Sequence, residues 1–230
     1  MKEGKVVRMI RDEGLEKLVT TIKEGDIRKT LSIAESLMSG GYSVKDILMK
    51  IILRAAVEYG ESVSSIDGRT KEGIEAMKKY TEVTLAVYSL LEALDKHIKV
   101  SEPIGVAIFA CVKGEGHSLI KDILSLIFKA EGFKVHNFRK PATPESIVNK
   151  VKETSDGIVV FSATQPKTIP TIKEVLEILK KESLREKVKI MLGGRLIKNE
   201  IQMKEIKGEI DVLINDIPES LEIAKNFPKR

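Results

Sequence analysis

Residues 104–132 read IGVAIFACVKGEGHSLIKDILSLIFKAEG, and this stretch decides the fold of the second half of the chain. It opens with an apolar run of strand length, from Ile104 to Val112, which ends at a short polar segment containing two glycines. An apolar pattern with the 3.6-residue period of a helix then runs from Leu119 to Phe128. The pattern predicts a buried strand, a loop and a helix.

The loop between the predicted strand and helix carries Glu115 and, two residues later, His117. A glycine on each side of Glu115 lets a ligand approach the backbone closely. A carboxylate that accepts the N–H of an imidazole fixes its tautomer and raises its basicity, which prepares a histidine to bind metal. The alternative is that Glu115 and His117 only cap the following helix, and the residues alone do not decide between the two.

The composition indicates a globular protein with a mixed-charge surface. The chain has 230 residues, 42% of them hydrophobic, which is enough for one large or two small domains. The 39 basic and 34 acidic residues are interspersed, so the net charge of +5 does not mark a nucleic-acid-binding face. A single cysteine, Cys111, excludes an internal disulfide and a Cys-based zinc cluster. Because no apolar run reaches membrane-span length and no signal segment opens the chain, we expect a cytoplasmic location.

Residues 1–100 predict a helical domain. Amphipathic patterns, interrupted by stop signals such as Gly25 and Gly60, divide it into four helices, the last over about 71–96. Short turns between them favour an antiparallel four-helix bundle that acts as a cap domain. At residues 101–103 the period changes, and this is the expected domain boundary.

Residues 101–230 predict an α/β domain. The candidate strands are 104–112, 134–139, 157–164, 187–192 and 211–215, and the candidate helices are 118–131, 144–154, 168–182, 196–206 and 217–227. Strands that alternate with helices imply right-handed crossovers and a parallel sheet covered on both faces. Five such strands are compatible with the flavodoxin-like (Rossmann-like) order 2-1-3-4-5, although the sequence does not derive that order.

Residues that could bind a ligand follow three of the predicted strands. In such a sheet, ligands bind beyond the carboxyl ends of the strands, near the point where the strand order reverses. The loops there hold Glu115-Gly116-His117-Ser118, then Ser162-Ala163-Thr164, then Gly193-Gly194. The hydroxyls can instead satisfy strand-end backbone groups, and the two glycines can form only a strand-to-helix turn. The convergence of all three loops favours a ligand site.

Several other sites are disfavoured by residue type. The segment Gly114-x-Gly116-x-x-Leu119 has leucine where the dinucleotide fingerprint needs its third glycine. The chain contains neither a P-loop nor a His-Glu-x-x-His motif. Cys111 and Val112 end the first strand, where a receiver-type phosphoacceptor site needs acidic residues. Three further polar residues are expected to be structural: His97, His136 and the helix-capping Asp216.

With these loops in place, the sequence resembles the corrinoid (cobalamin) proteins of methyltransferase systems and the cobalamin-binding module of methionine synthase. The signature of that family is Asp-x-His-x-x-Gly, then Ser-x-Leu or Ser-x-Thr after the third strand, then Gly-Gly after the fourth. The corresponding positions here are Glu115-x-His117-x-x-Ile120, Ser162-x-Thr164 and Gly193-Gly194. Similar segments at 112–114, 130–135 and 45–60 extend the resemblance over nearly the whole chain.

The resemblance implies a cofactor, a mechanism and partners. His117 would be the lower axial ligand of cobalt in cobalamin or a related corrinoid, with Glu115 tuning its proton state. The nucleotide tail of the cofactor would enter a slot lined by Glu115, Gly116, His117, Ser118, Ser162, Thr164, Gly193 and Gly194. Cobalt would shuttle between methyl-Co(III) and Co(I), so the chain would carry a methyl group between partner methyltransferases without being a complete enzyme.

Two departures from the signature keep alternatives open. Glu115 lengthens the carboxylate arm by one methylene, and glutamate at this position also occurs in cobalamin-dependent light-sensing regulators. Ile120 replaces a glycine that keeps room near the nucleotide tail, so either the slot is reshaped or cobalamin binds weakly. The alternatives are a cobalamin-responsive sensor that acts through another protein, because residues 1–99 contain no convincing DNA-recognition domain, and a relative that has lost the cofactor.

Overall fold

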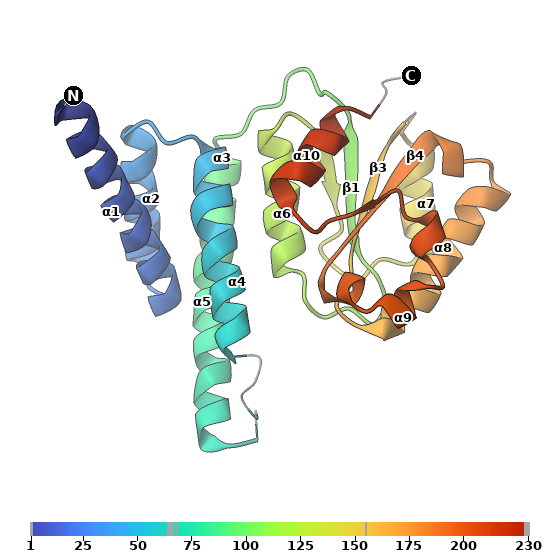
Figure 1. Cartoon of the computed structure of the whole chain (residues 1–230), viewed down its shortest axis with the longest axis horizontal. Coiled ribbons are helices and arrows are strands. Elements are labelled where there is room, and N and C mark those ends of the chain that lie inside the picture. Colours follow the sequence, from blue (N-terminus) through green and yellow to red (C-terminus); the bar gives the residue numbers. More distant parts are fainter. Residues whose placement is uncertain (1, 64–66, 68, 155, 228–230) are drawn as a thin grey trace. The chain divides into compact units, whose positions relative to one another are not determined.

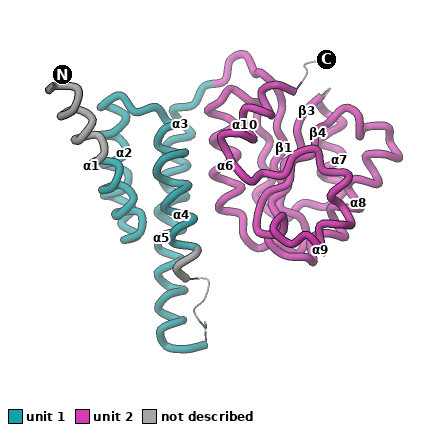
Figure 2. The backbone as a smooth tube through the Cα atoms, viewed as in Figure 1, with its two compact units in different colours: residues 1–99 teal, residues 100–230 magenta. Residues whose placement is uncertain are grey.

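The structure is a computed structural model that describes residues 2–63, 67, 69–154 and 156–227. It divides into two compact units, residues 1–99 and residues 100–230 (Figure 2). The first unit is helical and the second combines helices with a sheet (Figure 1).

The first unit consists of helices that begin where the sequence offers capping side chains. Its elements are α1 (Lys2–Glu24), α2 (Ile27–Ser39), α3 (Val44–Ile47), a π-helical turn (Leu48–Ile52), α4 (Leu53–Val63) and α5 (Lys71–Asp95). The side chains of Asp26, Ser43 and Thr70 accept hydrogen bonds from the first turns of α2, α3 and α5. The π-helical turn follows α3 directly and leads into α4, so the predicted third helix is one run of helical turns.

The second unit is built on a five-stranded parallel sheet. Its strands are β1 (Val106–Cys111), β2 (Lys134–Asn137), β3 (Gly157–Ser162), β4 (Val188–Gly193) and β5 (Val212–Leu213), and its helices are α6 (Leu119–Ala130), α7 (Pro144–Lys152), α8 (Ile169–Lys181), α9 (Glu200–Met203) and α10 (Ile217–Lys225). The strand order is β2-β1-β3-β4-β5, and every pair is parallel. The prediction of a helical region followed by a flavodoxin-like parallel sheet is confirmed.

Helices cover both faces of this sheet, with α6 and α10 on one face and α7 and α8 on the other (Figure 1). Successive side chains of a strand point to opposite faces. Ile108 and Val159 therefore join the core beneath α7 and α8. On the other face Phe109 packs edge-on against Phe128 of α6, with ring centroids 5.1 Å apart.

The strand register brings the three predicted loops to one edge. Cys111 at the end of β1 pairs with Ser162 at the end of β3. Ser162 in turn pairs with Gly193 at the end of β4. The loops that follow β1, β3 and β4 therefore start side by side at the carboxyl edge of the sheet.

Part of the predicted secondary structure is wrong. The helix expected over 196–206 is broken into a 3-10 turn at Arg195–Lys198 and the short helix α9. Asn199 causes the break, because its side chain accepts a hydrogen bond from the backbone N–H of Gln202 (3.2 Å) and starts a new helix. The strand expected over 211–215 is reduced to the two residues of β5. Within the described residues, no helix is both long and apolar enough to span a membrane.

Candidate functional site

The loop after β1 is folded so that the Glu115 carboxylate points inward. Gly114 turns the chain at φ +98°, and a Cβ there would lie 3.0 Å from the Lys167 side chain and 3.2 Å from its carbonyl oxygen. A side chain is therefore excluded at this turn. Glu115 follows and is only 4% exposed.

The buried Glu115 carboxylate is held by hydrogen bonds from two loops. Its Oε2 accepts the backbone N–H of Thr164 (2.5 Å) and the Thr164 hydroxyl (2.8 Å). Its Oε1 accepts the backbone N–H of His117 (2.8 Å) and lies 3.0 Å from His117 Nδ1. Burial alone raises the pKa of this carboxyl, but the hydrogen bonds from Thr164 and His117 outweigh it and leave the pKa below its ordinary value of 4.5. Glu115 is therefore ionised at neutral pH.

An ionised Glu115 determines the tautomer of His117. A carboxylate only accepts hydrogen bonds, so in the neutral imidazole Nδ1 carries the proton and Nε2 has the lone pair. The His117 side chain is 59% exposed, while the Glu115 side chain behind it is fully buried. None of the described residues is hydrogen-bonded to Nε2. The arrangement presents one oriented nitrogen that can ligate a metal.

The alternative that Glu115 and His117 only cap the following helix does not agree with their hydrogen bonds. The residue that precedes α6 is Ser118, and its side chain makes no capping hydrogen bond to that helix. The hydrogen bonds of Glu115 go to Thr164 and His117 instead. Thr164 likewise bonds to Glu115, while Gln165 and Thr168 stand at the starts of the following 3-10 turn and of α8.

The other predicted residues have separate positions around this pair. A Cβ at Gly116 would have no neighbour within 4 Å, so the backbone beside His117 is open to a ligand. Gly194 has φ +103°, and a Cβ there would lie 2.3 Å from the carbonyl oxygen of Ala163. The turn itself therefore requires glycine at position 194, in agreement with the alternative that this residue only forms a strand-to-helix turn. Gly193 is less constrained, because a Cβ there would come no closer than 3.4 Å to the Ile214 side chain.

Cys111 lies beneath the loop as a buried thiol. Its Sγ is 3.7 Å from the carbonyl oxygen of His117. Burial raises the pKa of this thiol to about 11, so it is protonated at neutral pH. It is a packing residue of the sheet.

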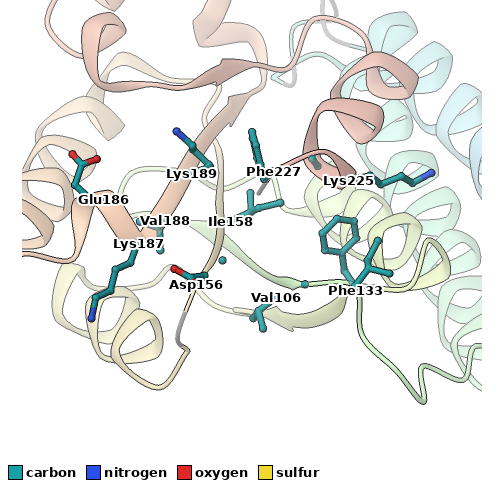
Figure 3. Close-up of a pocket in the computed structure, with 14 residues that line it drawn as sticks. Val106, Phe133, Asp156, Ile158, Glu186, Lys187, Val188, Lys189, Lys225 and Phe227 are labelled. Atoms are coloured by element: carbon teal, nitrogen blue, oxygen red, sulfur yellow. The ribbon is translucent and has the colours of Figure 1, made fainter. Parts of the chain in front are cut away.

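A pocket of about 290 Å³ lies at the other edge of the sheet (Figure 3). Its lining includes Val106, Ile158 and Val188 at the amino ends of β1, β3 and β4, with Phe133 and Phe227 beside them. This pocket and the His117 loop are separated by the length of the strands, so the pocket does not belong to the predicted site.

Sequence reasoning did not identify two contacts at the carboxyl edge. The Thr164 hydroxyl bonds Glu115 directly, across 49 positions of sequence, which only the strand register reveals. Lys121 is 1% exposed, and its ammonium group is enclosed by polar groups of α6, of β2 and of Phe138 just after β2. A signal for Lys121 was present, because it is three and seven residues before the buried Leu124 and Phe128 and so shares their helix face.

A flavodoxin-like domain with an exposed, oriented imidazole beyond the carboxyl ends of its strands is typical of an α/β ligand-binding protein, and that imidazole can ligate a metal. The family model described as "B12 binding domain" matches residues 105–219, half of the chain. The chain belongs to the B12-binding domain family. This confirms the predicted resemblance and the predicted cofactor class, cobalamin or a related corrinoid.

Similar proteins come from methanogens. Dimethylamine corrinoid protein 3 of Methanosarcina mazei is 35% identical over 94 residues, which are 41% of this chain and 56% of that protein. Trimethylamine corrinoid protein 2 of the same organism is 26% identical over 187 residues, 80% of this chain and 83% of that protein. The matches to the dimethylamine relatives thus span about half of their length.

A solved structure has the same fold. The monomethylamine corrinoid protein of Methanosarcina barkeri superimposes with a TM-score of 0.73 at 20% identity, covering 93% of this chain and 98% of that one.

The residues at the carboxyl edge fit a corrinoid. A corrinoid would need one nitrogen ligand from the protein, and the exposed His117 Nε2 could provide it. The open backbone at Gly116 leaves room beside it. Ile120, in the first turn of α6, is half-buried. The assignment of individual cofactor-binding residues stays a prediction.

Proposed function

We propose that this chain is a corrinoid-binding methyl carrier that exchanges a methyl group with partner methyltransferases. The observation that supports this most is His117, whose Nδ1 lies 3.0 Å from a buried carboxylate while its ring is exposed. When bound, the corrinoid supplies a cobalt centre that takes up and releases the methyl group. A cytoplasmic location is part of the proposal.

Each residue of the loop has a defined role in this proposal. His117 would ligate the cobalt of a bound corrinoid through Nε2. The Glu115 carboxylate accepts the hydrogen bond of His117 Nδ1–H. Its negative charge makes the lone pair of Nε2 a stronger ligand for a metal. Thr164 keeps the Glu115 carboxylate in place with two hydrogen bonds. The slot for the nucleotide tail lies among Gly116, Ser118, Ser162, Gly193 and Gly194.

The names of the relatives suggest which compounds could donate the methyl group. Their names associate them with dimethylamine and trimethylamine. Methylated amines are therefore the first methyl donors to test with this chain, and the methyltransferases that act on them are its first candidate partners.

The test must separate a carrier from a cobalamin-responsive sensor. The corrinoid-loaded protein, with its cobalt reduced, is incubated with methyl-labelled amines and soluble extract of the cells that encode it. Label that reaches the protein only when it is loaded, and that then passes to a thiol acceptor, supports the carrier. No label on the loaded protein, together with corrinoid-dependent binding to another protein, would contradict the carrier and favour the sensor.

A further inference from the structure

The carboxyl edge of the sheet contains a buried polar network that the proposed function does not use. Its centre is Lys121 on α6, whose side chain is 1% exposed. The Lys121 ammonium donates to Asp122 Oδ1 (2.6 Å), to the Phe138 carbonyl oxygen (3.0 Å) and to the side-chain oxygen of Asn137. A buried ammonium costs much desolvation energy unless it is fully bonded, and three acceptors satisfy its three N–H groups.

Asn137 completes the network from the end of β2. Its side-chain amide donates to Asp122 Oδ1 (2.8 Å) and to the Ser125 hydroxyl (3.0 Å). Asn137 itself pairs with Phe109 of β1. The network therefore fastens the first turns of α6 to the carboxyl end of β2.

The network is connected to the loop by backbone. The N–H of Asp122 donates to the carbonyl oxygen of Ser118 (2.9 Å) and closes the first turn of α6. Ser118 directly follows His117. A displacement of Asp122 is thus transmitted to His117 through one turn of helix.

His117 consequently lies between two anchors on opposite sides of β1. On one side Glu115 is bonded to Thr164, just beyond β3. On the other side Lys121 and Asp122 are bonded to Asn137 of β2. The sheet order places β2 and β3 on either side of β1.

We propose that Lys121, with Asp122 and Asn137, is a positioning device that holds the His117 loop in the geometry needed for ligation. Its connection to the proposed cofactor site is the backbone hydrogen bond from Asp122 to Ser118, and the bonds of the Lys121 ammonium go to Asp122, Asn137 and Phe138 rather than to the imidazole. Without this network the end of the loop next to α6 is less restrained. The hydrogen bonds from His117 and Thr164 to the Glu115 carboxylate then open more often, and His117 Nε2 samples other directions. The functional consequence rests on the proposed role of His117, but the effect on the loop does not.

The test uses the cofactor-free protein and two backbone amides. The N–H groups of His117 and Thr164 both donate to Glu115, so their rates of hydrogen exchange report how often these two hydrogen bonds open. The variants are Lys121→Met and Asn137→Ala, of which the second keeps the Lys121–Asp122 ion pair and remains informative if the first does not fold. Arg185→Met is the control, because Arg185 forms an ion pair with Asp211 (2.9 Å) that is less deeply buried and lies near the start of β4, away from the loop.

The expected result is a loss of protection of about tenfold or more at His117 and Thr164, relative to core amides such as that of Val160, in both network variants. Arg185→Met should leave this ratio unchanged even where it lowers overall stability. Equal losses at loop and core in the network variants would overturn the inference, since Lys121 would then contribute only to overall folding.

A second readout connects the device to ligation. After loading with hydroxocobalamin, the network variants should show a smaller spectral signature of imidazole ligation than Arg185→Met does. An unchanged signature would overturn the functional half of the inference. If wild-type protein binds no corrinoid while the exchange contrast is present, the proposed function fails and the positioning role of Lys121 stands.

Discussion

At the scale of single residues, the site depends on one buried charge. The Glu115 side chain is fully buried, and each of its oxygens accepts hydrogen bonds from Thr164 or His117. Hydrogen bonds to a charged group each contribute about 1.5–3 kcal/mol when no partner is left unsatisfied. The carboxylate therefore both fixes the imidazole and ties two strand ends together.

Replacing Glu115 by Gln should destabilise the cofactor-free protein by about 2 kcal/mol at neutral pH, because the amide N–H₂ opposes the donors of Thr164. The pKa of Glu115 lies below 4.5 in the folded protein, so its stabilising effect is present above the unfolded value and is lost as the pH falls through the folded one. Urea unfolding should show the difference from wild type shrinking below about pH 4.5. A difference that is independent of pH would contradict this account of the charge.

The Thr164 hydroxyl offers a more selective change. Thr164→Val keeps the shape of the side chain and the backbone N–H but removes the bond of Oγ1 to Glu115. Loss of such an indirect partner typically weakens metal binding by about 10–100-fold. Hydroxocobalamin titration should show a loss of this size for Thr164→Val and near wild-type binding for Thr164→Ser, which keeps the hydroxyl. Equal binding by the two variants would exclude a role for this hydroxyl.

Sequence reasoning at this scale predicted the contact between Glu115 and His117 but missed the contacts of Thr164 and Lys121. Glu115 and His117 are two positions apart, so local chemistry predicts their pairing. The bond from Thr164 to Glu115 depends on which strands are neighbours, and Lys121 was passed over because a charged residue was not expected on the buried face of α6. Long-range register and the burial of a fully bonded cation are not visible in local patterns.

At the scale of elements, the glycines of the loops have unequal roles. Gly194→Ala should destabilise the protein by about 2 kcal/mol or more, because φ is +103° and the new Cβ would meet the Ala163 carbonyl at 2.3 Å. Gly116→Ala should change stability by no more than about 0.5 kcal/mol, since its Cβ position is empty. Thermal unfolding of the two variants measures the contrast. A large effect of Gly116→Ala would mean that the loop is more closely packed than the structure shows.

Element boundaries were predictable where capping and periodicity agree. Asp216 begins α10 by accepting the N–H of Glu219 (2.8 Å), as the sequence predicted. The prediction of one helix over 196–206 was wrong. The apolar spacing there suits a helix, but the side chain of Asn199 caps a new helix and so interrupts the first. β5 starts later than predicted: the Asp211 carboxylate accepts the N–H of Ile190 (2.8 Å), so a side chain takes the place of a backbone carbonyl beside β4.

At the scale of the whole molecule, the chain consists of two compact units, and the expected boundary near residue 100 stays a prediction about independent folding. The unit from 100 to 230 has its own core on both faces of the sheet. We therefore expect a fragment of these residues to fold alone and to unfold cooperatively in urea. A fragment without cooperative unfolding would show that residues 1–99 are needed to complete that core.

The central claim is that His117 is the cobalt ligand of a corrinoid-binding protein. The most direct measurement is the visible spectrum of the purified protein after incubation with hydroxocobalamin and removal of free cofactor. The comparison includes His117→Ala and, as a matched control, replacement of the exposed His97 by Ala. The account predicts retained colour and an imidazole-ligated spectrum for wild type and His97→Ala, and the loss of that spectrum in His117→Ala. A wild-type protein that retains no cofactor, or a His117→Ala variant with an unchanged spectrum, would contradict it.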